Sequence, residues 1–345
     1  MQRDHHAGTR FALILALILA GCDGSRTGTE FTHEFAGEVR PWTDRPFDSA
    51  PADFTFALVS DLNGGERERV FEIAMAQLSL LRPEFVISIG DLIDGGSEDR
   101  DKLNAEWDSF DTRAATVTAP LFYVGGNHDL TNVIMREVWE SRYGRRYYHF
   151  IYNGVLFLVL DTEDNAEARM HEIYLARASA IEVLQGDQPE KWSETEYYHM
   201  PERSFGKLGR QQIAYFGAVL EEHAEVRWTF LLMHKPAWKN ASDSGFGEID
   251  VALGERAYTL FNGHLHSYAY AARNGRDHIT LGTTGGSQNA KDEMAFDHVT
   301  LVRVTADGPV IGNLRLDGIL DKRGRIPLDG GELCYQSSEC GLAGR

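Results

Sequence analysis

The sequence predicts an α/β domain over residues 53–320, and two observations carry this prediction. In the first part of that span, short apolar runs alternate with helical patterns, which is typical of parallel strands joined by right-handed crossovers. From residue 267 on, apolar runs follow one another with only turns between them, which is typical of antiparallel strands. Because 43% of the residues are hydrophobic, the chain has enough apolar side chains for one large core.

The elements of the first part alternate regularly. The opening run, FTFALVS, is rich in aromatic and β-branched residues and therefore predicts a buried strand. The helical pattern that follows ends at Pro83, which cannot continue a helix. The predicted order is strand, helix, strand, helix and strand over residues 54–60, 66–81, 85–89, 99–113 and 121–124.

The second part begins with a hairpin. Asn153 and Gly154 separate two apolar runs, and this dipeptide is typical of tight hairpin turns. Residues 163–205 are charged, aromatic and partly helical, and we expect this insertion to form a lid or rim over a site. After it the pattern predicts a helix over 208–222 and strands over 228–233, 257–261, 267–273, 279–281, 298–304 and 310–316.

Five short clusters of carboxylate, amide and imidazole residues follow apolar runs. Three of them follow the three predicted parallel strands, and ligands in such sheets gather beyond the carboxyl ends of the strands. This mixture of side chains suits borderline divalent or trivalent metal ions. The clusters are Asp61-Leu62-Asn63, Gly90-Asp91-Leu92-Ile93-Asp94, Gly126-Asn127-His128-Asp129, Met233-His234 and Gly263-His264-Leu265-His266.

The five clusters in this order resemble the calcineurin-like metallophosphoesterase superfamily, over roughly residues 53–305. The resemblance implies a four-layer αββα sandwich of two mixed β-sheets flanked by helices. It also implies hydrolysis of phosphate esters, either monoesters or diesters, at a centre of two divalent or trivalent metal ions (Mn, Fe or Zn). The implied nucleophile is a hydroxide that bridges the two ions.

The resemblance assigns the ligands as well. Two metal ions so close together need an anion between them, and the resemblance gives this bridging role to Asp91. The implied ligands are Asp61, Asn63, Asp91 and His266 for the first ion, and Asp91, Asn127, His234 and His264 for the second.

Two further residues have implied catalytic roles. His128 follows an asparagine ligand, and in the superfamily such a histidine contacts the phosphate and assists the leaving-group oxygen. Asp129 is expected to accept the other N–H of His128 and so to fix its tautomer. Asp94 is expected to form hydrogen bonds around the ligands.

Asn63 departs from the superfamily pattern, in which the first cluster is Asp-x-His. An asparagine there binds a metal weakly, holds a water or only forms hydrogen bonds. The departure keeps one alternative open, a degenerate relative that binds phosphate or metal without turnover. A metal-dependent amidase or lactonase is a weaker alternative, because its usual His-x-His-x-Asp-His pattern is absent.

The N-terminal residues predict export. The run FALILALILA is too short to span a membrane and has the length of the apolar region of a signal peptide. The tetrapeptide Leu19-Ala20-Gly21-Cys22 that follows it resembles the lipobox of bacterial lipoproteins. We therefore expect a signal peptide over 1–21, a lipid on Cys22, a polar tether over 22–52 and an extracytoplasmic location, on the periplasmic side or at the cell surface.

The remaining composition restricts the partners. A formal net charge of −18 argues against nucleic-acid polymers. It does not argue against a small phosphate ester as substrate, because bound metal ions reverse the local field. In the C-terminal tail, 321–345, Cys334 and Cys340 are expected to form a local disulfide in an oxidising compartment.

Overall fold

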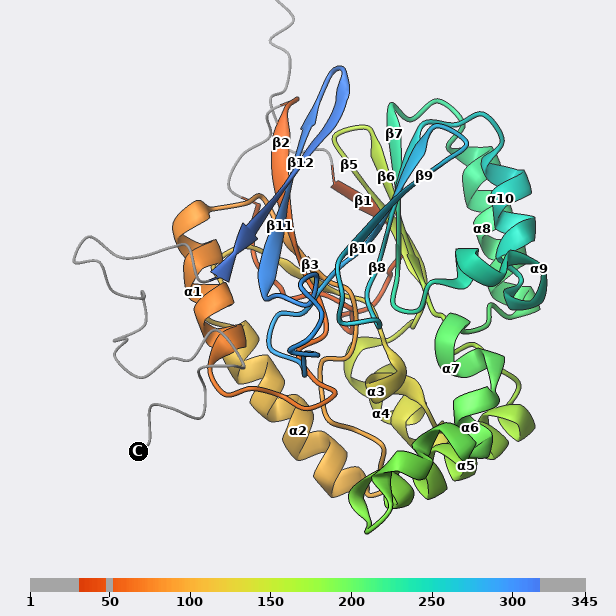
Figure 1. Ribbon diagram of the computed structural model, residues 1–345. Coiled ribbons are helices and arrows are strands. Elements are labelled where there is room, and N and C mark those ends of the chain that lie inside the picture. Colours follow the sequence, from red (N-terminus) through yellow and green to blue (C-terminus); the bar gives the residue numbers. More distant parts are fainter. Residues whose placement is uncertain (1–30, 48–51, 317–345) are drawn as a thin grey trace, which may run out of the picture.

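Two β-sheets packed face to face form the centre of the molecule, and helices cover the outer face of each (Figure 1). The computed structural model describes residues 31–47 and 52–316. The expected signal peptide 1–21, Cys22, the tail 321–345 and its two cysteines lie outside the described residues. Among the residues described, no helix is both long and apolar enough to cross a membrane.

The five-stranded sheet consists of β2 (Phe54–Val59), β3 (Val86–Ser88), β4 (Leu121–Tyr123), β11 (His298–Thr305) and β12 (Gly308–Arg315). Its order is β12-β11-β2-β3-β4. Strands β2, β3 and β4 are parallel, with Val86 opposite both Ala57 and Leu121. Strand β11 is antiparallel to β2 and to β12. The predicted change from parallel to antiparallel pairing is therefore confirmed within this sheet.

The seven-stranded sheet consists of β1 (Phe31–His33), β5 (Tyr148–Tyr152), β6 (Val155–Leu160), β7 (Trp228–Met233), β8 (Tyr258–Asn262), β9 (Ala269–Arg273) and β10 (Arg276–Thr280). Its order is β1-β5-β6-β7-β8-β10-β9, with β6, β7, β8 and β10 parallel. The predicted hairpin joins β5 to β6, and its two turn residues, Asn153 and Gly154, have positive φ of 46° and 74°.

Helices complete the four layers. Apolar side chains of α1 (Val70–Leu81), α2 (Arg100–Ala114) and α4 (Val133–Tyr143) pack on the five-stranded sheet. Those of α8 (Arg210–Glu222) and α10 (Phe246–Leu253) pack on the seven-stranded sheet. A 3₁₀ turn, η2 (Ala237–Asn240), and α9 (Ala241–Ser244) precede α10. This arrangement confirms the αββα sandwich.

Aromatic side chains fill the space between the sheets. Phe56 and Phe85 of one sheet stack at 5.3 Å between ring centroids, and Phe150 and Phe157 of the other at 4.6 Å. All four are fully buried, so truncating any of them to alanine is expected to cost about 3–5 kcal/mol. This core fixes the distance between the two sheets and hence between the strand ends that carry the site.

Residues 31–47 belong to the folded domain, although the sequence analysis places them in the tether. Strand β1 pairs with the edge strand β5, and Trp42 forms a bridge with Phe122 beside β4. Phe31 and Trp42 contact one another and Phe122 in the inter-sheet core. The segment covers one edge of each sheet, and this protects backbone groups that would otherwise be open to pairing with another chain.

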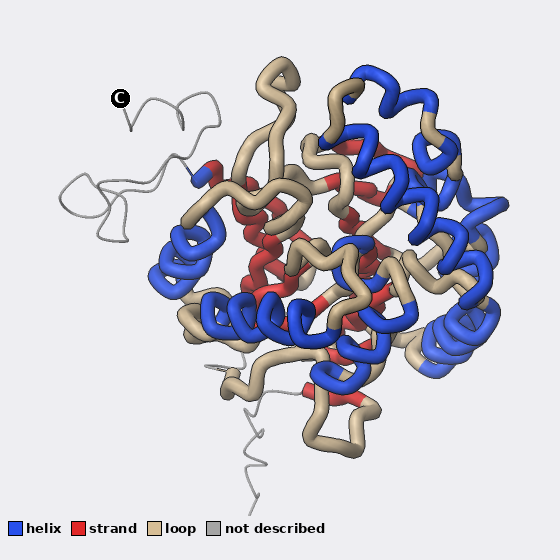
Figure 2. Tube along the Cα trace, turned by 90° about the horizontal axis from the view of Figure 1, so that it is seen from below, coloured by secondary structure: helices blue, strands red, loops and turns tan. Residues whose placement is uncertain are grey.

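The insertion forms a helical unit of its own. It contains α5 (Glu167–Gln185), η1 (Pro189–Glu194), α6 (Glu196–His199) and α7 (Pro201–Phe205). Its two ends meet, since Glu163 pairs with Lys207, and it has a small apolar cluster of its own. The unit lies at the lower right of Figure 1, and the view from below in Figure 2 shows helices and loops around the ends of the strands.

Candidate metal centre

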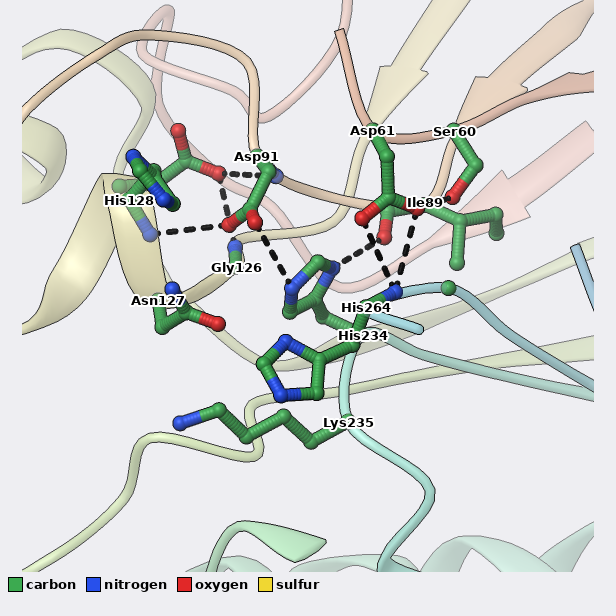
Figure 3. A network of polar contacts seen from close by, with 12 residues as sticks. Ser60, Asp61, Ile89, Asp91, Gly126, Asn127, His128, His234, Lys235 and His264 are labelled. Carbon is green, nitrogen blue, oxygen red and sulfur yellow. Dashed lines mark hydrogen bonds and ion pairs between the residues drawn. The ribbon is translucent and has the colours of Figure 1, made fainter. Parts of the chain in front are cut away.

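The candidate ligands come together from the carboxyl ends of strands in both sheets. Asp61 and Asp91 follow β2 and β3, and Asn127 begins the short helix α3 (Asn127–Leu130) after β4. His234 follows β7, and His264 lies in the turn after β8. Figure 3 shows these side chains pointing toward one another from opposite sheets. The expectation that the strand ends share one site is consistent with this placement.

Carboxylates and imidazoles form two overlapping groups. Within each group, one ligand atom from every residue lies within 4.8 Å of the others. Asp91 belongs to both groups, which is the position that a bridging carboxylate requires. The groups are Asp61, Asp91 and His266, and Asp91, His234 and His264. Each group is a part of one of the two expected ligand sets, without Asn63 or Asn127.

Direct contacts hold these residues close together. His234 Nε2 lies 3.1 Å from Asp91 Oδ2, and His266 Nε2 lies 3.3 Å from Asp61 Oδ1. The backbone N–H of His264 donates to both oxygens of Asp61, at 3.0 and 3.1 Å. Asp61 and Asp91 are fully or almost fully buried, so the two carboxylates are fixed in position.

Backbone conformation is unusual at four of the candidate ligands. Their φ angles are positive, a region that residues other than glycine seldom occupy and that often marks functional sites. The angles are 52° for Asp61, 56° for Asp91, 73° for His264 and 53° for His266. Such conformations persist only where the surrounding structure enforces them.

Glycines beside the ligands allow a close approach of backbone to side chain. A Cβ atom on Gly90 would lie 2.6 Å from Nδ1 of His234, and Gly90 has a φ of 93°. A Cβ atom on Gly126 would lie 2.3 Å from Oδ1 of Asp91. Any larger residue at either position would therefore displace a candidate ligand.

Each candidate histidine ligand has one ring nitrogen fixed by a backbone carbonyl. A carbonyl only accepts, so the nitrogen facing it carries a proton, and the other nitrogen is the one that can bind a metal ion once it is deprotonated. The contacts are His234 Nδ1 with Ile89 O at 2.8 Å, His266 Nδ1 with Ser287 O at 2.6 Å and His264 Nε2 with Arg203 O at 2.7 Å. The last of these carbonyls belongs to α7, so the insertion orients a candidate ligand.

Two buried polar atoms show that the site fits a metal ion. Asn127 Oδ1 has no hydrogen-bond partner among the described residues, and His234 Nε2 has none apart from its ion pair with Asp91. Buried polar atoms are normally satisfied. An amide oxygen and an imidazole nitrogen that converge on a carboxylate are a ligand set for borderline cations.

Electrostatics within the site couple Asp91 to His234. Burial opposes ionisation of Asp91, but the neighbouring histidines hold its pKa well below its ordinary value. Burial likewise opposes protonation of His234, yet the Asp91 carboxylate raises its pKa to about 9. Without a metal, a proton on His234 therefore balances the charge of Asp91, and a bound cation would replace that proton.

His128 lies beside the candidate ligands in the first turn of α3. Its Nδ1 contacts the carbonyl of Asp94 at 2.7 Å, which leaves Nε2 as the nitrogen that faces Arg177. Burial lowers the pKa of His128, so the neutral imidazole is favoured. Asp94 was expected to form hydrogen bonds around the ligands, and it contacts His128 through its backbone oxygen.

The expected contact between Asp129 and His128 is wrong. The Asp129 carboxylate is fully buried and accepts four backbone N–H groups, from Asp91 at 2.9 Å, Leu92 at 2.9 Å, Ile93 at 3.2 Å and Gly126 at 2.7 Å. The reason is geometric, because adjacent residues on a helix point in different directions. Asp129 thus holds the loop that carries Asp91, and Asp94 O takes the place expected for Asp129.

Asn63 is also tied to this loop. Its Nδ2 donates to the carbonyl of Leu92 at 3.0 Å, and its backbone N–H donates to Asp91 O at 2.9 Å. The amide oxygen is the end left for a metal or a water. The side chain is buried, so Asn63 has a defined structural role whether or not it binds a metal.

Two basic residues near the site were not among the predicted site residues. Lys235 is 1% exposed, and its Nζ contacts Glu163 Oε1 at 2.8 Å and the carbonyl of Glu202 at 2.9 Å. Arg177 of α5 places Nη2 3.3 Å from His128 Nε2. Only the position of Lys235 directly after His234 offered a sequence signal, and nothing in the charged insertion distinguished Arg177.

Fold and site together define an αββα metallophosphoesterase-type protein with candidate sites for two metal ions. The sequence profile of the calcineurin-like phosphoesterases matches residues 54–268, and the chain belongs to this family. The resemblance inferred from the five clusters is therefore confirmed. No curated protein matches the chain in sequence.

Solved structures share the fold at low sequence identity. A dimetal phosphatase from Danio rerio is 15% identical with a TM-score of 0.50, and the match covers 76% of this chain and 99% of that one. GAP50, the anchor in the inner membrane complex of Plasmodium, is 14% identical with a TM-score of 0.50, over 84% and 90%. A purple acid phosphatase from yellow lupin is 11% identical with a TM-score of 0.50, over 81% and 54%.

Proposed function

We propose that the protein hydrolyses phosphate esters in a reaction that depends on two metal ions. The observation that carries the proposal is the pair of ligand groups that share Asp91 at the strand ends. Membership of the calcineurin-like phosphoesterase family supports the same reaction class. The proposed ligands are Asp61, Asp91 and His266 for one ion, and Asp91, Asn127, His234 and His264 for the other.

The chain's own residues have separable tasks in this proposal. Two bound metal ions would supply Lewis acidity toward the phosphoryl oxygens and an activated water as nucleophile. Asp61 and Asp91 are the two carboxylates in the ligand set, so the loaded site keeps a positive charge that attracts a phosphate. His128 places Nε2 at the substrate cavity, with Nδ1–H held by the Asp94 carbonyl. Once Nε2 has taken up a proton, it can donate that proton to the leaving oxygen as the ester bond breaks.

The test is hydrolysis by the full chain after chelation and reloading with Mn²⁺, Fe²⁺ or Zn²⁺. We expect turnover of a chromogenic phosphate ester that disappears with the chelator and returns with at least one metal. The His128→Ala variant should bind the same amount of metal and lose turnover. Absence of turnover with every metal, in protein that contains metal, would refute the proposal.

One observation favours a second function, binding without turnover. Asn63 replaces the usual histidine of the first cluster, and its amide nitrogen is used to hold the Leu92 carbonyl. GAP50, which shares the fold, is described as an anchor. We expect Asn63→His to raise affinity for the more weakly bound metal by about tenfold, which metal titration measures. If the native chain does not hydrolyse phosphate esters and Asn63→His does, the native chain functions by binding alone.

Attachment to a membrane through a lipid on Cys22 completes the proposal. It rests on the apolar run and the Leu19-Ala20-Gly21-Cys22 tetrapeptide, and it places the enzyme outside the cytoplasm. Expression in a bacterium with labelled fatty acid should label the native chain and not Cys22→Ser. An unlabelled native chain would refute the anchor and leave the hydrolase proposal intact.

A further inference from the structure

Arg177 is a buried cation without a counter-charge. The residue is 8% exposed, and its hydrogen-bond contact among the described residues is with His128 Nε2, at 3.3 Å. No carboxylate of the described residues forms an ion pair with it, whereas Arg146 pairs with Asp161 and Arg169 pairs with Glu202. An isolated buried charge is costly, so the position of Arg177 calls for an anion supplied from outside.

The backbone opposite Arg177 leaves room for the guanidinium. Gly96, with a φ of 63°, lies so close that a Cβ atom there would be 2.7 Å from Nη1 of Arg177. Helix α5 therefore brings the guanidinium against the loop that follows Asp91. The side chain reaches across from the insertion to the metal side of the molecule.

Arg177 lies in the wall of a cavity of about 810 Å³ that adjoins the candidate metal centre. One side of this cavity contains Asn127, His128 and His264, and the other side is built by the insertion. The insertion's wall carries Arg177 next to apolar and aromatic side chains, namely Ile181, Leu184, Trp192 and Tyr197. A phosphate at the metal side would thus have its ester group facing an apolar wall.

We propose that Arg177 binds the third unesterified oxygen of a phosphomonoester and so selects monoesters over diesters. This inference rests on the proposed function and specifies its substrate class. Arg177 Nη2 lies 3.3 Å from His128 Nε2, and both residues line the cavity together with Asn127 and His264, so an anion that accepts from the guanidinium lies beside the candidate ligands, where the scissile phosphoryl group would bind. A guanidinium is well suited to this, because its N–H groups match phosphate oxygens.

The selectivity follows from the number of free oxygens. A phosphomonoester has three unesterified oxygens, so two can face the metal ions while one remains for Arg177. A phosphodiester has only two, and its second ester group would face the guanidinium and leave the buried charge unpaired. The native chain should therefore hydrolyse monoesters with the higher kcat/KM.

The test compares the metal-loaded full chain with Arg177→Gln and Arg177→Lys, on 4-nitrophenyl phosphate and bis(4-nitrophenyl) phosphate. The matched control is Arg210→Gln, an exposed arginine of α8 whose ion pair with Glu248 lies at the surface. Arg177→Gln should lower kcat/KM for the monoester by about 10- to 100-fold and for the diester by less than about threefold. Arg177→Lys should recover part of the loss, and the control should match the native chain.

A second readout, binding of inorganic phosphate and of dimethyl phosphate by calorimetry, does not depend on turnover. Arg177→Gln should weaken phosphate binding by about tenfold or more and leave dimethyl phosphate unchanged. Equal losses for both esters, or unchanged phosphate binding, would overturn the inference. If the native chain hydrolyses neither ester, the proposed function is refuted and not the role of Arg177. The binding of inorganic phosphate, measured by calorimetry, still decides that role.

Discussion

The role of Asp129 gives the sharpest structural prediction. Its carboxylate oxygens each accept two backbone N–H groups, Oδ1 from Leu92 and Ile93, and Oδ2 from Asp91 and Gly126. In Asp129→Asn, the amide nitrogen replaces one of these oxygens and cannot accept. Whichever way the amide is turned, two buried N–H groups lose their acceptor.

The expected loss of stability follows from the two N–H groups that lose their acceptor. A buried donor without a partner costs about 1–3 kcal/mol, so the substitution should destabilise the fold by about 2–6 kcal/mol. At roughly 2 °C per kcal/mol for a domain of this size, Tm should fall by about 4–12 °C. Because the lost contacts hold the backbone of Asp91, metal affinity should fall as well.

The assay is thermal unfolding together with metal titration, and the matched control is Asp187→Asn, which makes the same change at an exposed position. The control should change Tm by less than about 1 °C. If Asp129→Asn kept its Tm and its metal affinity and lost only kcat, Asp129 would act on His128, and the role assigned from the four N–H contacts would be refuted.

Three further predictions concern neighbouring groups. His128→Gln should lower kcat by about 10²- to 10⁴-fold with unchanged metal content, and a matching loss of metal would contradict a catalytic role. Lys235→Met should lower the free energy of unfolding by about 3–5 kcal/mol, measured with denaturant, because Glu163 then stays buried without its partner. Adding Glu163→Gln should restore most of this stability. A double variant as unstable as Lys235→Met would contradict the stabilising role of the ion pair. Because the Asp91 carboxylate raises the pKa of metal-free His234 to about 9, His234 is protonated below that pH and metal must displace the proton. Apparent metal affinity should thus fall by about tenfold per unit as pH falls below about 9, and titrations that give a pH-independent affinity would contradict this.

Strand ends were predictable from sequence because local chemistry decides them. Apolar runs stop where a glycine or a polar residue follows, as at Gly90 and Asp91, and parallel order places such ends at one edge of a sheet. The sequence could therefore indicate both the fold and the set of candidate ligands. The left-handed backbone at Asp61 and His264 was not predictable, because the surrounding contacts enforce it.

Other features depend on contacts that no local pattern encodes. Residues 31–47 were assigned to the tether because a strand of three residues shows little periodicity. In the structure, Phe31 and Trp42 pack into the core. The direction in which the Asp129 side chain points depends on the conformation of α3, a helix of only four residues. Arg177 gains its importance only because α5 folds back across the strand ends and brings it to His128.

If two metal ions share Asp91, the number of ions bound per chain must show it. Elemental analysis of the reloaded full chain should give about two ions per chain, as the two ligand groups require. Asp91→Asn should lower occupancy at both positions, whereas His266→Ala should lower it at one, with Arg210→Gln unchanged as the control. A native content of one ion per chain, or an Asp91→Asn variant that keeps both ions, would contradict a centre of two ions bridged by Asp91.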